Sequence, residues 1–136
     1  MSNLNLYRIE KDRIRENLNK YTKKAFKLLP KCKNPHILDI GCGTGVSTIK
    51  LATISDGHVN GIDIDVTSLN LLQRKIKETG LNNRVSVIRD SILTMDFPEE
   101  SFDIIWAEGS IFVIGFENSI KKWRRFLKPN GFLVIH

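Results

Sequence analysis

Apolar and polar residues alternate along the chain in two different patterns. Five short runs rich in β-branched and aromatic residues have the composition of buried strands, at 37–40, 58–64, 84–89, 101–107 and 132–135. Between them lie three stretches whose apolar residues recur every three or four positions, at 46–53, 66–79 and 116–127. Strands that alternate with helices predict an α/β fold with a doubly wound, mostly parallel sheet and helices on both faces.

A longer amphipathic stretch precedes the first strand. Residues 5–29 are expected to form one or two helices, because apolar residues recur at spacings of four and three: Ile14, Leu18, Tyr21, Ala25 and Leu28. This side of the helix is expected to cover an apolar surface. The helix ends close to the first strand, so it could also lie over a ligand pocket as a lid. Tyr7, Arg8 and Tyr21 are the candidate lid residues, although Tyr21 also fits a buried core position.

The first strand leads into the stretch ILDIGCGTG at residues 37–45. Asp39 lies near the end of the strand, and three glycines at alternate positions, Gly41, Gly43 and Gly45, permit a tight turn that other residues make at a cost. The expected helix begins directly afterwards. Glycines lack Cβ atoms and let a ligand approach the backbone, while free N–H groups at a helix start favour negative charge. The stretch therefore predicts a ligand cradle, with a turn that holds no ligand as the alternative.

Two kinds of ligand compete for this cradle. A dinucleotide fingerprint, Gly-x-Gly-x-x-Gly, requires a third glycine where this chain has Val46. Asp39 also argues against a pyrophosphate, because a carboxylate two residues before the first glycine would repel it. The same carboxylate suits a cation or a hydroxyl. An amino acid, which carries both an ammonium and a carboxylate group, fits the stretch better.

This stretch resembles motif I of the class I S-adenosylmethionine (SAM) dependent methyltransferases. The resemblance implies that Asp39, Gly41, Cys42, Gly43 and Gly45 hold the methionine end of the cofactor. It also implies the fold of this family, a sheet with the strand order 3-2-1-4-5 in its first five strands. Tyr21 of the leading helix is expected to reach the same cofactor.

Two further acids follow the second and third expected strands. Asp63 lies eighteen residues after Gly45, near the spacing at which a carboxylate binds both ribose hydroxyls of a nucleoside. Its setting resembles the family's ribose-binding acid, and the resemblance includes the neighbouring Ile64. Asp90 and Ser91 occupy the place where the family binds the adenine amino group, although Asp90 could instead cap a turn. Asp65 is expected to cap the next helix.

Glu108 follows the fourth strand, whose Phe-Asp-x-Ile pattern at 102–105 resembles the strand beside the methyl-transfer centre of these enzymes. Ligands in open α/β sheets collect at the carboxyl ends of the strands. Glu108 is therefore a candidate catalytic residue that faces the methyl acceptor, as a general base or by orienting a hydroxyl or amine. The alternative is a cap for the short helical segment that follows.

The resemblance covers residues 37–135 and extends to the turn at 128–131, where Asn130 replaces a glycine of the family's Leu-Lys-Pro-Gly-Gly signature. Asn tolerates the left-handed conformation, so the departure costs little. The family fold has seven strands, and its final hairpin is missing from this sequence. We therefore expect residues 1–36 to form a basic helical cap, residues 37–136 to form the SAM-binding core, and the chain to be part of a longer protein.

Charge is unevenly distributed over the net +6 of the chain. Residues 1–36 hold ten Lys/Arg and three Asp/Glu, a net charge of +7, so the basic excess belongs to the leading segment alone. Such a segment could attract RNA or an anionic substrate, or could be a solvated helix face. The histidines are scattered without metal-ligand spacing, and no metal is expected.

The cysteine content and the hydropathy of the chain indicate where in the cell the protein is expected. Cys32 and Cys42 fit a reducing cytosol, because Cys42 lies inside the glycine turn and a structural disulfide is not expected there. No apolar run reaches the ~18 residues of a membrane span, and the charged N-terminus does not resemble a secretory signal. A cytoplasmic protein without a membrane partner, monomeric or homodimeric, is expected.

The function implied by the resemblance is SAM-dependent transfer of a methyl group, in line from the sulfonium to the acceptor. Enzymes that methylate exocyclic nucleobase amines carry Asn/Asp-Pro-Pro-Tyr/Phe where this chain has Ala107-Glu108-Gly109-Ser110, and no cysteine lies in this half for cytosine C5 chemistry. Both differences favour a small-molecule acceptor, as does a Trp-x-Glu-Gly-x-Ile/Leu pattern similar to small methyltransferases of that kind. RNA methylation guided by the basic helix, and a SAM-binding partner subunit without catalysis, are the alternatives.

Overall fold

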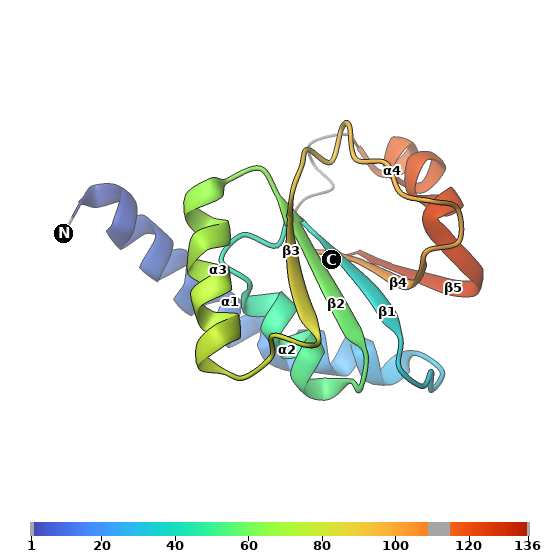
Figure 1. Ribbon diagram of the computed structural model, residues 1–136, viewed down its shortest axis with the longest axis horizontal. Helices are drawn as coiled ribbons and strands as arrows, with labels where there is room; N and C mark the ends of the chain where they lie inside the picture. Colours follow the sequence, from blue (N-terminus) through green and yellow to red (C-terminus); the bar gives the residue numbers. More distant parts are fainter. Residues whose placement is uncertain (1, 109–114, 136) are drawn as a thin grey trace.

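The structure is a computed structural model that describes residues 2–108 and 115–135. Its elements follow one another along the chain as shown in Figure 1. They are α1 (Asn3–Leu28), β1 (His36–Ile40), α2 (Val46–Ile54), β2 (His58–Asp63), α3 (Val66–Glu78), β3 (Val85–Arg89), β4 (Phe102–Ala107), α4 (Phe116–Trp123), the short 3-10 helix η2 (Arg124–Phe126) and β5 (Leu127–Ile135).

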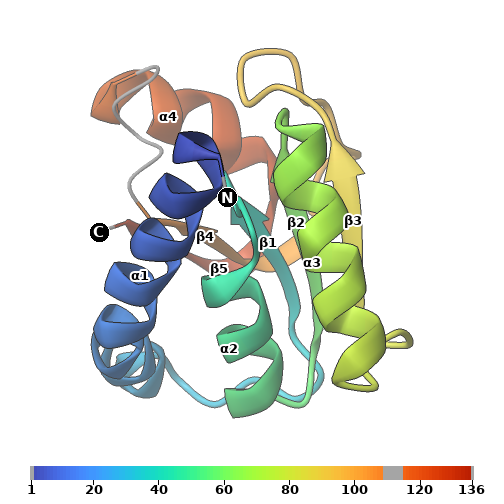
Figure 2. The same cartoon turned by 90° about the vertical axis from the view of Figure 1, so that its left-hand side faces the viewer.

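The strands form one parallel sheet in the order β3-β2-β1-β4-β5, as the resemblance implied. Helices α1, α2 and α3 lie on one face of the sheet and α4 lies on the other (Figures 1 and 2). The prediction of a doubly wound α/β fold is therefore confirmed. Since β1 is central, the turn after it lies between the ends of β2 and β4, at the point where the strand order reverses.

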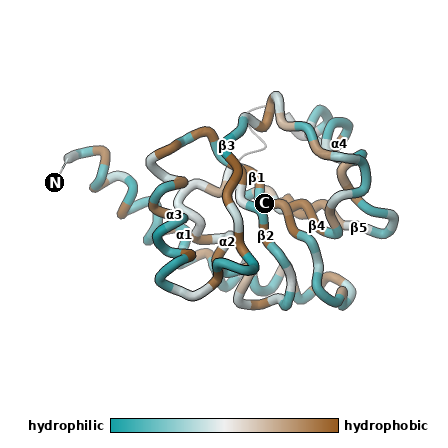
Figure 3. Tube along the Cα trace, viewed as in Figure 1, coloured by the Kyte–Doolittle hydropathy of each residue, from teal (hydrophilic) through white to brown (hydrophobic). Residues whose placement is uncertain are grey.

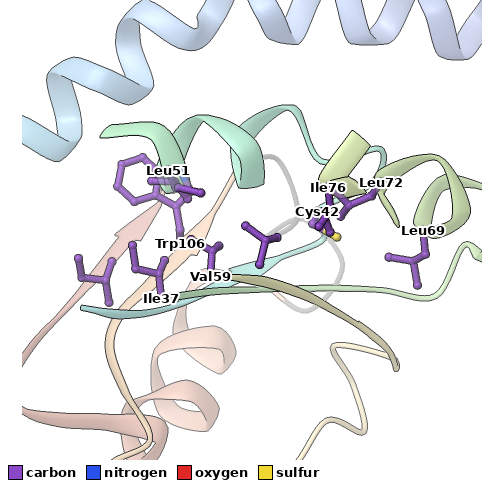
Figure 4. Close-up of a cluster of buried hydrophobic side chains, with 11 residues drawn as sticks. Ile37, Cys42, Leu51, Val59, Leu69, Leu72, Ile76 and Trp106 are labelled. Atoms are coloured by element: carbon purple, nitrogen blue, oxygen red, sulfur yellow. The ribbon is translucent and has the colours of Figure 1, made fainter. Parts of the chain in front are cut away.

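Successive side chains along the strands point to opposite faces of the sheet and contribute to two apolar layers, one on each face. The layer beneath α2 and α3 includes Ile37, Val59 and Trp106, together with Leu51 and Leu72 from the helices (Figure 4). The layer on the α4 face is built from the other strand positions, Leu38, Ile40, Ile62 and Ile105, with Trp123 and Phe126. The central strands β1 and β4 are buried on both faces and therefore have nearly continuous apolar runs, which is why the sequence pattern located them.

The predicted start of the fifth strand differs from the structure. Residues 128–131, expected as a separate turn, lie within β5, which begins at Leu127. The pairing of β4 and β5 shifts register between Phe102 and Ile104, and this irregularity accommodates the extra residues. Asn130 has a φ of 65° and thus adopts the left-handed conformation that asparagine tolerates. The expected cap by Asp65 is confirmed, because its side chain accepts a hydrogen bond from the Thr67 amide.

The leading helix faces the domain with a different side from the one predicted. Along α1 the buried or half-buried positions include Arg8, Asp12, Arg15, Asn19 and Thr22, and only near its end does it contribute Ala25 and Phe26 to the apolar core. The predicted stripe is mostly exposed, since Ile14, Leu18 and Leu28 retain 58%, 41% and 86% of their accessible surface. The prediction that these residues cover an apolar surface of this chain was therefore wrong.

Candidate functional site

Four strand ends bring the candidate site residues to one edge of the sheet. Asp39 lies in β1, which leads into the glycine turn. Asp63 ends β2, Asp90 follows β3 and Glu108 follows β4. In the register of the sheet, Asp39 lies opposite Gly61 of β2 and Trp106 of β4. Because all strands are parallel, these side chains share the carboxyl edge that open α/β sheets use for ligands.

Backbone hydrogen bonds, most of them to β2, hold the glycine turn in place. Gly41, Gly43 and Gly45 have φ values of 67°, 55° and 86°, which glycine alone adopts without strain. The amides of Gly41 and Cys42 donate to the carbonyl of Ile62, the amide of Gly45 donates to Cys42, and that of Gly43 donates to Asp63 Oδ2 at 2.8 Å. These four amides of the turn are therefore not available to an anion, and the expectation of free N–H groups at the helix start concerns the next amides, at the beginning of α2.

Two of these glycines have close neighbours, and the buried Leu72 beside Gly45 can give way less easily than the flexible end of Arg15 beside Gly43. A Cβ on Gly45 would lie 2.1 Å from Leu72 Cδ1 of α3, and one on Gly43 would lie 2.7 Å from Arg15 Nη1 of α1. Cys42 points beneath the turn toward Gly61, and burial raises the pKa of its thiol, with the charges of Asp39 and Asp63 adding to the effect. A thiol that stays protonated is a packing residue and a poor nucleophile.

Asp39 is the most unusual group at this edge, because its carboxyl group is almost fully buried. Oδ2 accepts hydrogen bonds from Ser47 and Thr48 at the start of α2, both at 2.7 Å. Oδ1 is buried and has no hydrogen-bond partner among the residues that the structure describes. Burial raises the pKa of Asp39 to about 7, against the lowering effect of the two hydroxyls, and the nearby charge of Glu108 raises it further.

Glu108 lies on the same side of the sheet as Asp39. Its Oε1 accepts hydrogen bonds from Thr22 of α1 at 2.7 Å and from the indole of Trp106 at 2.9 Å. The carboxylate is thus fixed between α1 and β4. Neither predicted role, general base or helix cap, is decided by these contacts, and residues 109–114, on which the predicted Trp-x-Glu-Gly-x-Ile/Leu pattern continues, lie outside the described residues.

Asp63 and Asp90 lie at adjacent strand ends. Asp63 accepts from the amides of Gly43 and, at 3.0 Å, Asp65, which leaves lone pairs for a ligand because a carboxylate has about four acceptor sites. The Asp90 amide donates to the carbonyl of Asp63 and ties the two ends together. Asp90 Oδ1 accepts from the Ser91 amide and the Thr94 hydroxyl, so Asp90 does cap a turn. Its adenine role stays a prediction, as does that of Ser91.

The polar side of α1 is the part of the site that sequence reasoning missed. Arg8 pairs with Asp65 at 3.4 Å, Asp12 pairs with Lys75 at 3.5 Å and also accepts from Thr44, and Arg15 donates to the carbonyl of Cys42 at 3.5 Å. With Asn19 and Thr22, these residues recur at spacings of four and three, like the apolar stripe. This second, polar periodicity is the sequence pattern that could have indicated which side of α1 faces the site.

The structure does not bring Tyr21 to this cluster. Its side chain is 49% exposed on the outer side of α1, with the ammonium of Lys20 at 5.0 Å from the ring centroid. Its neighbour Thr22 points inward instead. A cofactor contact by Tyr21 stays a prediction, but its alternative, a buried core position, is wrong. Tyr7 is also exposed, although it lines a cavity of about 110 Å³ between the first turns of α1 and the glycine turn.

Comparison with known proteins assigns the chain to a family. A family model described as a methyltransferase domain matches residues 37–131, from β1 into β5. The chain belongs to the class I SAM-dependent methyltransferases. The expected resemblance is thereby confirmed, and the matched segment includes the glycine turn, Asp63 and Asp90.

Relatives place the chain within this family. An uncharacterised protein of Haemophilus influenzae is 33% identical over 103 residues, which are 74% of this chain and 41% of that protein. The phosphoethanolamine N-methyltransferase of Plasmodium falciparum is 32% identical over 117 residues, 84% of this chain and 43% of the relative. The chain thus spans less than half the length of these two relatives.

A solved structure shares the fold. The geranyl diphosphate C-methyltransferase of Streptomyces coelicolor, determined with Mg²⁺, geranyl diphosphate and S-adenosylhomocysteine, superposes with a TM-score of 0.79 at 19% identity. The alignment covers 85% of this chain and 44% of that one. Cofactors of this family carry an ammonium group, and the buried, unpartnered Oδ1 of Asp39 is an acceptor that fits one.

Proposed function

We propose that this protein is a SAM-dependent methyltransferase that acts on a small-molecule acceptor. The observation that carries the proposal is the unpartnered Oδ1 of Asp39 at the carboxyl edge of the sheet. A buried carboxylate oxygen needs a donor, and the ammonium group of a methionine moiety would provide one with a full positive charge. When bound, SAM would supply a methyl group that its sulfonium already activates.

Other residues would hold the nucleoside part of the cofactor. Asp63, whose oxygens accept only two backbone hydrogen bonds, would accept from the ribose hydroxyls. Ile64, 65% exposed beside it, would cover one face of the adenine ring. Asp90 would accept from the adenine amino group, with Ser91 next to it. These roles position the cofactor, which is most of what transfer from an activated donor requires of a protein.

The leading helix would act as the lid over this site. Its ion pairs with Asp65 and Lys75 are partly exposed, so breaking them costs little. The cavity of about 110 Å³ beneath its first turns is smaller than the roughly 300 Å³ of a typical ligand pocket. We therefore expect α1 to move outward as the cofactor enters and to return with Arg15 over the glycine turn.

The acceptor is proposed to be a small molecule. Ala107-Glu108 at the end of β4 lacks the Asn/Asp-Pro-Pro-Tyr/Phe signature of nucleobase amine methylation. The relatives named above include enzymes for phosphoethanolamine and geranyl diphosphate, which are both small. RNA methylation would require phosphate contacts, and these make affinity fall steeply with salt. Activity on a small acceptor that changes little with salt would argue against it.

Titration of the full chain with S-adenosylhomocysteine and, separately, with NAD tests the cofactor assignment. Micromolar binding of the first alone is expected. Asp63→Ala should weaken it by at least about 100-fold, because hydrogen bonds to a charged group contribute about 1.5–3 kcal/mol each and two are lost. Glu78→Ala, an exposed acid of α3, is the matched control and should bind like the wild type. NAD binding, or an unaffected Asp63→Ala variant that is folded by circular dichroism, would refute the assignment.

Glu108→Gln separates catalysis from positioning. Gln keeps an oxygen that can accept from Thr22 and Trp106 but removes the negative charge that raises the pKa of Asp39. Affinity for S-adenosylhomocysteine at pH 8 should therefore stay within about threefold, while the pH at which affinity falls by half should move down. Methyl transfer lost in this variant would identify Glu108 as the base. Transfer that is retained would assign it a positioning role, and a purified protein with no transfer at all would favour a non-catalytic SAM-binding subunit.

A further inference from the structure

The outer side of α1 carries a row of exposed apolar residues, interrupted by Lys11 and by the half-buried Ala25. Of the twelve large apolar side chains that are exposed among the described residues, eight lie on this one helix. Six of them, the outer apolar stripe, recur along one line of the helix: Leu4, Tyr7, Ile14, Leu18, Tyr21 and Leu28. Single exposed apolar residues are ordinary on a protein surface, whereas a row of them marks an interaction site.

The middle and the end of the stripe are separate from the cofactor site, whereas Leu4 and Tyr7 at its start also line the cavity beside the glycine turn. Ile14 and Leu18 are 58% and 41% exposed, whereas the next residues inward, Arg15 and Asn19, lie against the domain. Adjacent residues point about 100° apart around a helix, so the stripe flanks the inward side rather than forming part of it. It extends over about 36 Å from Leu4 to Leu28 at about 1.5 Å per residue. In Figure 1 the first turns of α1 project beyond the rest of the molecule.

Positive charge lines the remaining exposed surface of this helix. The exposed basic residues of α1 far outnumber its exposed acids, Glu10 and Glu16; they are Lys11, Arg13, Lys20, Lys23, Lys24 and Lys27. Figure 3 shows apolar and polar positions alternating along the projecting part of the helix. The partner that fits such a surface combines negative charge with an apolar interior.

We propose that α1 binds an anionic lipid surface, lying in its plane with the outer apolar stripe inserted between the headgroups. A straight, convex row of side chains suits a flat fluid surface, since a protein partner would need a matching groove. The two tyrosines of the stripe each have a lysine beside the ring, Lys11 at 5.9 Å from Tyr7 and Lys20 at 5.0 Å from Tyr21. Tyrosine and lysine place an apolar stem in the acyl region and a polar tip among the headgroups.

This inference revises the expectation of no membrane partner, which rested on the lack of a spanning segment. Within the described residues, no helix has the length and apolarity that crossing a bilayer requires. A helix that lies on the surface needs neither, because it inserts only one side. The inference also stands independently of methyl transfer, since the test changes Ile14 and Leu18, which have no role in the proposed cofactor site.

Co-sedimentation of the full chain with lipid vesicles tests the proposal. Binding is expected to vesicles that contain phosphatidylglycerol, to be much weaker to pure phosphatidylcholine, and to fall as salt is raised. The double variant Ile14→Ser, Leu18→Ser should lower the partition coefficient about tenfold or more, because two apolar side chains no longer insert. The double variant Lys20→Gln, Lys24→Gln should lower binding to anionic vesicles by about tenfold as well.

Matched controls lie elsewhere on the chain. Leu93→Ser changes an apolar side chain of similar exposure, 52%, in the loop after β3, and Lys121→Gln with Lys122→Gln changes two exposed lysines of α4. Both controls should bind vesicles like the wild type. Circular dichroism verifies that every variant is folded.

Three outcomes would overturn the proposal. The first is a wild-type protein that does not sediment with anionic vesicles at low salt. The second is a stripe variant that binds them unchanged. The third is a dimer in sedimentation velocity that the stripe variant dissociates, which would make a second copy of this chain the occupant. Binding of single-stranded RNA without vesicle binding would likewise assign the basic helix to nucleic acid.

Discussion

Asp39→Asn is expected to weaken binding of S-adenosylhomocysteine by about two orders of magnitude, without removing any hydrogen bond within the protein. Asn can still accept from Ser47 and Thr48, so the start of α2 keeps its partners. Its second polar atom is an NH2 group, which would face the ligand's ammonium instead of accepting from it. Removing one partner of a buried charge pair costs about 2–5 kcal/mol.

The pH dependence of binding should identify the same group. An ammonium ligand requires the ionised carboxylate, and the pKa of Asp39 without ligand is raised to about 7. Affinity should therefore rise up to about tenfold per pH unit below 7 and level off above it. Calorimetric titration from pH 5.5 to 8.5 measures this profile, and Asp39→Asn should give a flat one. A flat profile in the wild type would contradict the ammonium contact.

The stability of the ligand-free protein should respond in the opposite direction. A carboxyl group whose pKa is raised from its ordinary 3.8 to about 7 holds a proton in the folded state that the unfolded state releases. Its contribution is complete below pH 3.8 and is lost as pH rises through 7, by about 4 kcal/mol at most. Asp39→Asn should lose this decline between pH 5 and 8 in urea unfolding.

Gly45→Ala is expected to lower the free energy of unfolding by about 2–5 kcal/mol. The new Cβ would lie 2.1 Å from Leu72 Cδ1, and Leu72 is fully buried, so α3 would have to shift. Overpacking of this kind costs about 1–3 kcal/mol, and a φ of 86° adds about 1–2 kcal/mol of backbone strain. Urea unfolding measures the loss.

Gly80→Ala is the matched control for this change. Gly80 has φ of 69°, so alanine meets similar backbone strain, but nothing lies within 4 Å of its Cβ position. A loss of about 1 kcal/mol is expected. Equal losses in the two variants would show that contact with Leu72 plays no part and that the glycine turn tolerates a side chain.

Much of this protein was predictable from local sequence. The central strands β1 and β4 are buried on both faces and so are nearly continuous apolar runs, and the glycine turn needs three positive φ values, which its three glycines indicate. Asp63 and Asp90 follow strands directly, so the parallel sheet brings them to one edge whatever else the chain does. The polar partners of Asp39 lie within nine residues of it and share its strand-turn-helix unit.

Tertiary structure decided which side of α1 faces inward. Two stripes on that helix have the same spacing, one apolar through Ile14 and Leu18, the other polar through Asp12, Arg15 and Thr22. The spacing shows that the residues of each stripe lie on one side of the helix. It carries no information about the surface of the domain against which the helix packs. That surface is assembled from distant segments: the carbonyl of Cys42, Thr44, Lys75 and the carboxylate of Glu108. Because it is polar, its groups require polar partners once they are buried, and the polar stripe is the one that supplies them.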